Sequence, residues 1–427
     1  MPLLTGRGVH LPNRKEPAAS RDVVALTDHR HVYVPISYEG NKGHCLLKPY
    51  AAVLRGQVIA APETTDGAPI VSTVSGVFTE QRTIEHPLYG TLDCAVLDCM
   101  LSEESVPAAE PTNTDALSAD AIIEAARKAA IVDEIDSAYL YDKLRVWREV
   151  GCDVLVGDGV EPEPYASAAW AVMNESIEQV RAGLQLAARV LASKGFGEPE
   201  QEIAVCLPAG RRRPLQQRLG DVPLYQVHGR YPVTAYVPRP LGKRVMRIGV
   251  QALLALYRAA AFGEAQTVAV VTVAGDAVAT PQNVRVPFGT TVGTVLRHCG
   301  LSSEPQYLIM GDMMTGVALP DEEQLILAGT TCLLALTERP APASTVCMGC
   351  GRCARVCHAG LLPYEIAREL ENMHYEHLAR LRADECDGCG ACSYVCPAGR
   401  DLTSLMAEAQ RADDGSIFLN WGEQHDA

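Results

Sequence analysis

The chain has 427 residues, 48% of them apolar and 21% charged, so it exceeds the size at which one hydrophobic core keeps growing. Its formal charge of -15, from 37 basic and 52 acidic residues, argues against a nucleic-acid partner, because binding phosphates requires a basic face. No apolar run approaches about 18 residues and no signal peptide opens the chain, so we expect a multidomain cytoplasmic protein without a membrane span.

Short runs rich in Val, Thr, Gly and Pro fill the N-terminal part of the chain, which predicts a small all-β unit over residues 1–101. The stretch from Ser102 to Asp120 is acidic, contains proline and has almost no large apolar residue. We interpret it as a linker that ends at a helix N-cap, either Ser118 or Asp120.

Residues 118–262 alternate helical patterns with short β-like runs, which predicts an α/β domain with a mainly parallel sheet. We expect helices near 121–130, 168–194 and 250–261, and strands near 153–157 and 202–207. Residues 266–337 begin and end with β-rich runs around a short helical pattern at 292–298, so they predict a small α+β module. A Pro/Ala-rich linker (338–345) separates this module from a segment of different character.

Eight of the fifteen cysteines follow that linker in two blocks, both spaced C-x2-C-x2-C-x3-C. The first block is Cys347, Cys350, Cys353 and Cys357, and the second is Cys386, Cys389, Cys392 and Cys396. This is the ligand spacing of cubane iron–sulfur clusters, and finding it twice predicts two 4Fe–4S clusters within residues 342–412. C-x2-C pairs also bind zinc, so a pair of structural zinc sites is the rival interpretation.

The spacing also predicts which thiols share a cluster. Three cysteines on one tight, glycine-rich loop can turn three thiolates to three corners of a cube, whereas we expect the fourth at the start of a helix and facing away. In two-cluster ferredoxins that fourth cysteine ligates the other cluster. We therefore assign Cys347, Cys350, Cys353 and Cys396 to the first cluster, and Cys386, Cys389, Cys392 and Cys357 to the second.

Other candidate residues have plainer interpretations. The pattern from Leu362 to Leu381 predicts a packing helix, and we expect His374 and His377 on it to be surface residues rather than a site. Cys206 and Cys332 fall in apolar runs, so we expect both to be buried thiols. We also expect inert burial for Cys94 and Cys99, and a redox pair is the alternative. The three arginines at 211–213 predict a solvated loop or a docking site for an acidic partner or a phosphate.

Several segments, taken together in their order along the chain, resemble the C subunit of the Rnf electron-transport complex. The segments that carry the resemblance are GRGVHLPNRKEPAAS (6–20), LRGQVIA (54–60), STVSGVF (72–78), DVLVGDGVEPEPYASAAWAVM (153–173), GDMMTG (311–316) and the cysteine array. The resemblance implies four domains: a lipoyl-like β barrel-sandwich (1–101), a Rossmann-like α/β domain (118–262), a soluble-ligand-binding β-grasp (SLBB) module (266–337) and a helical dicluster ferredoxin module (342–412).

The middle domain of this family binds FMN and NADH through a loop of the type G-x-G-G-A-G-F-P. At the matching place the chain reads AAIVDEIDSAYLYDKL (129–144), which has none of those glycines. Asp133, Glu134 and Asp136 put negative charge where a phosphate would sit, and like charges repel. Asp158 replaces the family's Asn, and RIGVQALLAL (247–256) lacks the Asn and Thr of the flavin-site helix. We therefore expect FMN and NADH binding to be lost.

Glu161 and Glu163 do match the family and are the candidate cofactor-binding residues, as relics of the fold or as contacts to another ligand. We assign no catalytic residue. The sequence favours a relay that passes single electrons through two 4Fe–4S clusters from a reduced donor to a partner reductase, and within the family it looks like the carriers associated with proline reductase. The alternative is an FMN-dependent component that oxidises NADH, an NADH:acceptor oxidoreductase at the periphery of a membrane complex.

Overall fold

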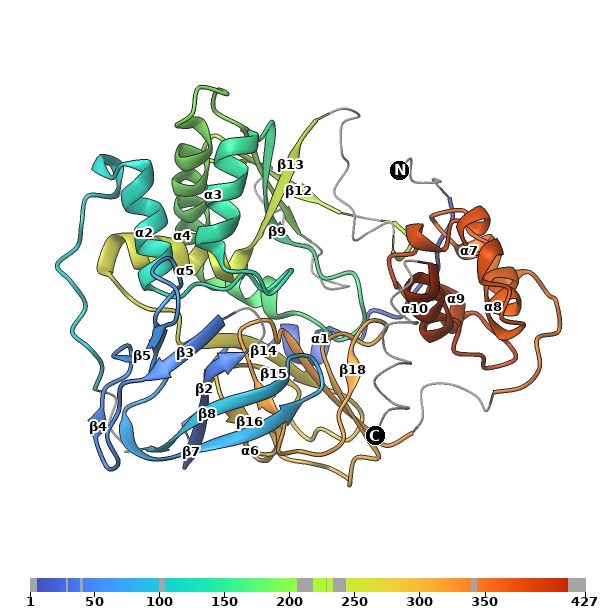
Figure 1. Cartoon of the computed structure of the whole chain (residues 1–427), viewed down its shortest axis with the longest axis horizontal. Coiled ribbons are helices and arrows are strands. Elements are labelled where there is room, and N and C mark those ends of the chain that lie inside the picture. Colours follow the sequence, from blue (N-terminus) through green and yellow to red (C-terminus); the bar gives the residue numbers. More distant parts are fainter. Residues whose placement is uncertain are drawn as a thin grey trace.

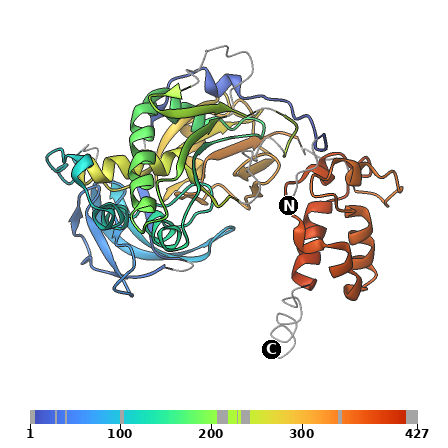
Figure 2. The same ribbon diagram turned by 90° about the horizontal axis from the view of Figure 1, so that it is seen from above.

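The computed structural model describes residues 6–27, 30–38, 41–99, 104–205, 218–227, 229–232, 243–338 and 344–413. Within these residues, four sheets and their helices form one large body, and the C-terminal helices form a smaller lobe at its side (Figures 1 and 2). The predicted array of cysteines lies in this lobe. Cys206 and the arginines at 211–213 fall outside the described residues.

The N-terminal part is all β, as the sequence predicts. Its sheet has the strand order β4-β7-β8-β2-β3-β5-β6. The strands are β2 (His31–Tyr38), β3 (Asn41–Cys45), β4 (Ala52–Val53), β5 (Val58–Pro62), β6 (Ile70–Val71), β7 (Gly76–His86) and β8 (Gly90–Cys99). Val32 and Val34 of β2 pack on Leu97 of β8, because alternate residues of a strand face the same side.

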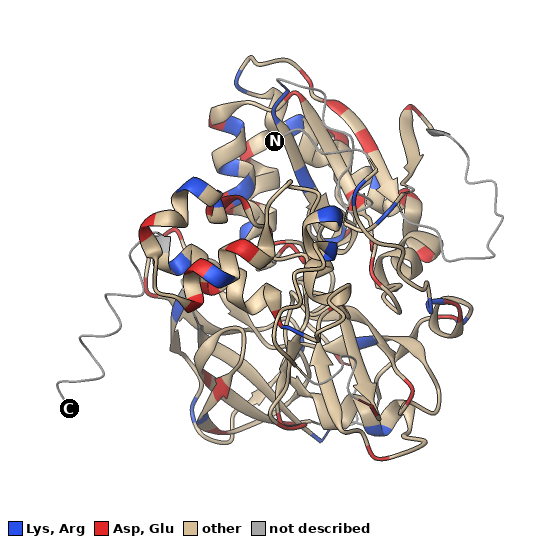
Figure 3. Ribbon diagram, turned by 90° about the vertical axis from the view of Figure 1, so that its right-hand side faces the viewer, with Lys and Arg blue, Asp and Glu red and all other residues tan. Residues whose placement is uncertain are grey.

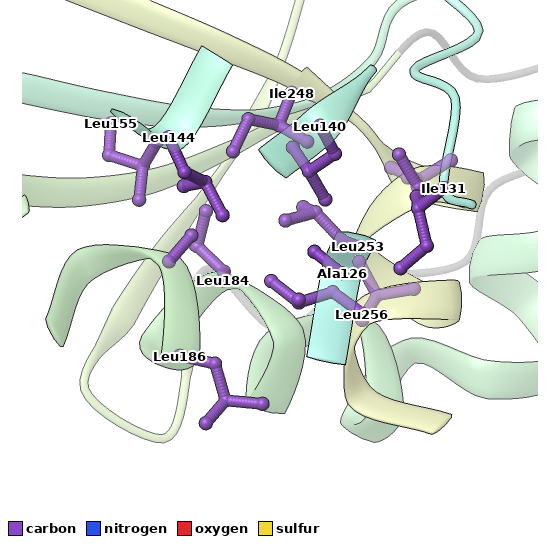
Figure 4. Packing of buried hydrophobic residues seen from close by; sticks show 14 of the residues in the cluster. Ala126, Ile131, Leu140, Leu144, Leu155, Leu184, Leu186, Ile248, Leu253 and Leu256 are labelled. Carbon is purple, nitrogen blue, oxygen red and sulfur yellow. The ribbon is translucent and has the colours of Figure 1, made fainter. Parts of the chain in front are cut away.

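The central part has the predicted parallel sheet, in which β9, β10, β12 and β13 run parallel and β11 pairs antiparallel at the edge. Its elements are α2 (Ala119–Lys128), α3 (Leu140–Val150), β9 (Val154–Gly159), α4 (Ala168–Ala192), β10 (Glu200–Val205), β11 (Arg218–Leu219), β12 (Val222–Gln226), β13 (Val245–Gly249) and α5 (Val250–Phe262). Ser118 is the N-cap of α2 and accepts from the amide of Ala121. Leu155, Leu184 and Leu253 meet in the core between the sheet and its helices (Figure 4).

The third part contains β14 (Val268–Ala274), β15 (Gln282–Pro287), β16 (Thr290–Thr291), α6 (Val292–Cys299), β17 (Tyr307–Met310), β18 (Val317–Ala318), β19 (Leu325–Ile326) and β20 (Cys332–Leu336). The sheet order β1-β15-β14-β20-β17-β18 includes a strand from the other end of the chain, β1 (Val24–Ala25). The sequence predicts the α+β composition of this part but not that strand.

The N-terminal segment before β1 contacts both the C-terminal lobe and the large body. The amide of Gly8 donates to Val356 in the C-terminal lobe, and Val9 forms a β-bridge with Tyr231. Lys15, which precedes α1 (Glu16–Ala19), is buried and donates to the carbonyl of Ala166 at 2.7 Å. The segment therefore ties the lobe to the large body.

The C-terminal lobe consists of α7 (Arg352–Val356), α8 (Pro363–Glu371), α9 (Ala391–Tyr394), α10 (Leu402–Asp413) and three 3-10 turns (Tyr375–His377, Ala379–Leu381 and Ala383–Glu385). Ile366 and Leu370 of α8 pack against Met406 of α10. The helix predicted to reach Leu381 ends at Glu371, because Met373 takes a left-handed φ of 59° that a helix cannot continue through.

The structure corrects one prediction about the cysteines and supports another. The spacing predicts Cys357 at the start of a helix, but this residue is the C-cap of α7, and α8 begins six residues later.

Cys94 and Cys99 are five residues apart on β8 and so face opposite sides of the sheet; they pack in different hydrophobic clusters, and both are free thiols. Burial raises the pKa of each to about 12, which fits inert thiols rather than a redox pair.

Among the described residues, no helix combines the length and apolar character that a membrane span requires.

Candidate functional site

The first thiol group brings together both cysteine blocks. Cys347, Cys350 and Cys353 line one small cavity, and the fourth cysteine on its wall is Cys396 from the second block. This is the grouping that the spacing predicts for the first cluster. Cys347 and Cys350 are exposed, whereas Cys353 is buried, so this site reaches the surface of the lobe.

The second thiol group lies deeper. Burial, together with the neighbouring thiols of Cys386 and Cys357, raises the pKa of Cys392 to about 12. The pKa of Cys389 is likewise raised mainly by burial, with Cys392 among its neighbours. Cys357 from the first block therefore lies near cysteines of the second block. Metal ligation requires each thiol to lose its proton, so occupation of this site is coupled to proton release.

The loops that carry the thiols depend on glycine. Gly349, Gly351, Gly388 and Gly390 all have φ between 67° and 77°, a left-handed conformation that costs little only for glycine. This curl turns an amide toward sulfur: the amide of Gly388 donates to Sγ of Cys386 at 3.4 Å. Four thiols per group and amides aimed at sulfur are the donor set that a cubane cluster requires.

His358 stands where the bacterial ferredoxin signature has proline, and it is buried beside the second thiol group. Its Nε2 lies 2.8 Å from Oδ2 of Asp387, and both side chains lie near Sγ of Cys389. The sequence identifies this histidine only as a replacement for proline. Its position directly after Cys357 is the signal that could have placed it beside the thiols.

Glu163, one of the two predicted cofactor-binding residues, joins three parts of the chain. Its carboxylate accepts from the amide of Met314 at 2.5 Å, from the hydroxyl of Thr315 at 2.8 Å and from the hydroxyl of Tyr231 at 3.0 Å. Tyr231 also reaches the carbonyl of Cys389 at 2.6 Å. Glu163 thus connects the central part, the 311–316 turn and the second thiol loop.

Glu161, the other predicted cofactor-binding residue, caps a helix. Its carboxylate accepts from the amides of Ala169 at 2.9 Å and Trp170 at 3.2 Å, which are donors in the first turn of α4 that the helix itself leaves unpaired. Burial raises the pKa of this carboxyl group. The oxygens of Glu161 and Glu163 are thus engaged within the chain, which agrees with their interpretation as relics of the fold.

The acidic loop that contains Asp133, Glu134 and Asp136 lies against the first turn of α5. Glu134 accepts from the amides of Gln251 at 2.7 Å and Ala252 at 3.0 Å, and Asp133 accepts from the amide of Gly249 at 3.0 Å. A Cβ on Gly249 would overlap the Glu134 carboxylate. The helix N-terminus, where a ligand's phosphate would otherwise find donors, is therefore capped by the chain's own carboxylates.

Lysine and arginine partners hold the other acidic side chains of this region. Lys143 pairs with the buried Asp133 at 2.5 Å and with Asp136 at 2.7 Å. Asp158, which replaces the family's Asn, is buried and paired with Arg247. These pairs explain how the chain tolerates so many carboxylates at one edge of the sheet, since a buried charge needs a partner.

Comparison with known proteins agrees with this architecture. Residues 5–100 match the family model of the RnfC barrel sandwich hybrid domain, and residues 346–400 match that of the 4Fe–4S dicluster domain. The fold and these two matches thus define a mixed α/β multidomain protein with an N-terminal segment similar to the RnfC barrel sandwich and a C-terminal segment similar to 4Fe–4S dicluster domains. The resemblance to the Rnf C subunit is confirmed by its relatives.

The C subunit of a Na(+)-translocating ferredoxin:NAD(+) oxidoreductase complex from Acetobacterium woodii is 28% identical, over 84% of this chain and 86% of that protein. The C subunits of ion-translocating oxidoreductase complexes from Vibrio cholerae and Pseudomonas aeruginosa are 26% and 29% identical, over 84% and 86% of this chain. The chain spans about half the length of these last two relatives, 49% in each case. A solved NAD+-reducing [NiFe]-hydrogenase chain is 17% identical, with a TM-score of 0.46 over 71% of this chain and 63% of that one.

Proposed function

We propose that this protein relays single electrons through two 4Fe–4S clusters, from a reduced donor protein to a partner reductase. The observation that carries the proposal is the small cavity that Cys347, Cys350 and Cys353 of the first block line together with Cys396 of the second. Cys347, Cys350, Cys353 and Cys396 would hold the first cluster, and Cys386, Cys389, Cys392 and Cys357 the second. When bound, such clusters supply reversible one-electron chemistry.

The surface near the first thiol group suits a docking partner. Cys347 and Cys350 are exposed, and beside them Val346 and Met348 are 89% and 63% exposed. Arg352 and Arg355 are exposed on α7 and line a shallow surface hollow with Tyr394. Within the described part of the chain neither arginine has an ion pair. A small basic and apolar face of this kind fits an acidic electron carrier, although acidic and basic residues are mixed over the lobe (Figure 3).

The same proposal holds that the central domain binds neither FMN nor NADH. Its support is the position of Glu134 and Asp133, which occupy the backbone amide donors at the start of α5 that a phosphate would need. The carboxylate oxygens of Glu161 and Glu163, which could otherwise accept hydrogen bonds from a cofactor, already accept hydrogen bonds within the chain. No residue of this domain is assigned a catalytic role.

The alternative function is that of an FMN-dependent, NADH-oxidising component of an electron-transport complex. Its support is the name of the complex that contains the Acetobacterium relative, a ferredoxin:NAD(+) oxidoreductase. We also propose that the middle modules are Rossmann-like and SLBB domains, within the four domain boundaries given above. We further propose that the protein is similar to the carriers associated with proline reductase, that it binds redox partner proteins, and that it is cytoplasmic and associates peripherally with a membrane complex.

Anaerobic purification separates the two functions. The relay predicts about eight iron atoms per chain, electron paramagnetic resonance signals from two reduced clusters and no flavin absorbance. Calorimetric titration with FMN and then NADH should give no binding in the micromolar range. Zinc in place of iron would overturn the cluster assignment, and tight FMN binding followed by bleaching with NADH would establish the enzyme instead.

A further inference from the structure

A second group of metal-ligand side chains lies in the lobe, apart from the thiols. Glu369, in the last turn of α8, accepts at Oε2 from Nδ1 of His374 at 3.0 Å and from Nδ1 of His377 at 2.9 Å. All three ligand atoms lie within 4.8 Å of one another. The sequence pattern predicts both histidines only as surface residues of a packing helix.

The backbone brings these residues together. Met373 reverses the chain with a φ of 59°, and the amide of His374 then donates to the carbonyl of Glu369 at 2.9 Å. His377 follows in the next 3-10 turn and folds back over the same carboxylate. The arrangement therefore depends on the local turn, not on a distant part of the chain.

The carboxylate is held in one orientation. Arg368 donates to its other oxygen, Oε1, at distances of 3.1 and 3.2 Å, which leaves Oε2 to face the two imidazoles. The side chain of Glu369 is 12% exposed, whereas those of His374 and His377 are 52% and 44% exposed. A metal ion could reach the three side chains from solvent, and Oε2 of Glu369 would already be oriented to bind it.

We propose that Glu369, His374 and His377 bind one divalent transition-metal ion, with zinc as the best fit. Ligands about 2.0–2.2 Å from a metal and roughly 90–110° apart stand about 3 Å from each other, which is the present spacing of each imidazole nitrogen from Oε2. Two imidazoles and one carboxylate suit zinc and its neighbours rather than magnesium or calcium. Water would complete the coordination, and the ion would tie α8 to the following turn.

The test uses the whole protein with both clusters intact, purified without oxygen and treated with a mild chelator. Calorimetric titration with zinc chloride should show one site per chain with a micromolar dissociation constant. His377→Ala should weaken that binding about tenfold or more, and Glu369→Gln should do the same. The chain offers a matched control in His31, which faces a single carboxylate, that of Asp98, so that His31→Ala should leave zinc binding unchanged.

Iron content and circular dichroism show whether each variant is folded, and the exposed His374→Ala supplies a second variant if Glu369→Gln is not. No zinc binding at roughly 100 µM by the folded wild-type protein would overturn the proposal, since sites of this kind bind more tightly. Zinc binding that persists in His374→Ala and His377→Ala and rises as iron is lost would also overturn it, because the thiols would then be the site. Neither result depends on whether the protein transfers electrons.

Discussion

The hydroxyl of Tyr231 lies 2.6 Å from the carbonyl oxygen of Cys389, and this contact links the central part of the chain to the second thiol loop. The same hydroxyl lies 3.0 Å from Glu163. Gly390, next to Cys389, packs so closely on the carbonyl of Met314 that a Cβ would be 2.8 Å from it. The lobe is therefore seated on the large body by specific polar and steric contacts.

Replacing Tyr231 with Phe removes the hydroxyl, so the carbonyl of Cys389 loses this donor, whereas Glu163 keeps its hydrogen bonds from Met314 and Thr315. We expect the free energy of unfolding to fall by about 1–3 kcal/mol, and hydrogen exchange of residues 386–392 to become faster, because the loop loses its contact with the body. Tyr394→Phe, at an exposed tyrosine of the same lobe, is the control. Unchanged exchange in Tyr231→Phe would mean that this contact does not hold the lobe.

Replacing Cys350 with Ser tests the pairing of thiols. We expect iron to fall to about half of the wild-type content, since the first cluster loses one ligand while the second keeps all four. Cys45→Ser changes a cysteine outside both groups and should keep its full iron content. An iron content of Cys350→Ser equal to that of the wild type would contradict the assignment of the first cluster.

The stability of the central domain should depend on pH through Glu134. Burial, together with the nearby Asp133, raises the pKa of this carboxyl group to about 8. The folded state then binds more protons than the unfolded chain between about pH 4.5 and 8, so the contribution of Glu134 to stability falls as the pH rises through that window.

Glu134→Gln should flatten that dependence. Because the side chain is only half-buried, we expect a difference on the order of 1 kcal/mol between about pH 6 and pH 8.5, measured by urea unfolding. Some dependence of the unfolding free energy on pH will remain, since burial also raises the pKa of Asp312 to about 8. Equal slopes in the variant and the wild type would show that Glu134 does not titrate as the geometry implies.

Reversing the charges of Arg352 and Arg355 to Glu should slow reduction of the protein by an acidic ferredoxin about tenfold at low salt. The reason is loss of electrostatic steering, so the difference should shrink as ionic strength rises. Arg380→Glu, an exposed arginine elsewhere on the lobe, serves as the control. Iron content must match the wild type in all variants. Equal rates would place the docking surface on another face.

The sequence predicts those features that depend on neighbours along the chain. The cysteine spacing predicts the two thiol groups, because ligands three residues apart on a loop reach the same cubane. The alternating patterns over 118–262 predict the parallel sheet, and Ser118 is one of the two predicted caps of the first helix. The prediction for Cys357, at the start of a helix, is wrong because spacing alone does not show on which side of a cysteine the helix lies.

What the sequence could not supply are contacts between residues far apart in the chain. The pairing of β1 with β15 joins residues 24 and 284, and no local pattern specifies such a partner. The sequence shows that residues 129–144 contain no glycine, but only the tertiary structure puts the Glu134 carboxylate against the amides of α5, more than a hundred residues away. Resemblance identifies Glu163 as a cofactor residue, whereas its bonds to Tyr231, Met314 and Thr315 follow from the packing of three modules. Residue spacing predicts ligands that lie close together along the chain. Contacts between distant segments form only in the tertiary structure, because buried polar groups must find hydrogen-bond partners there.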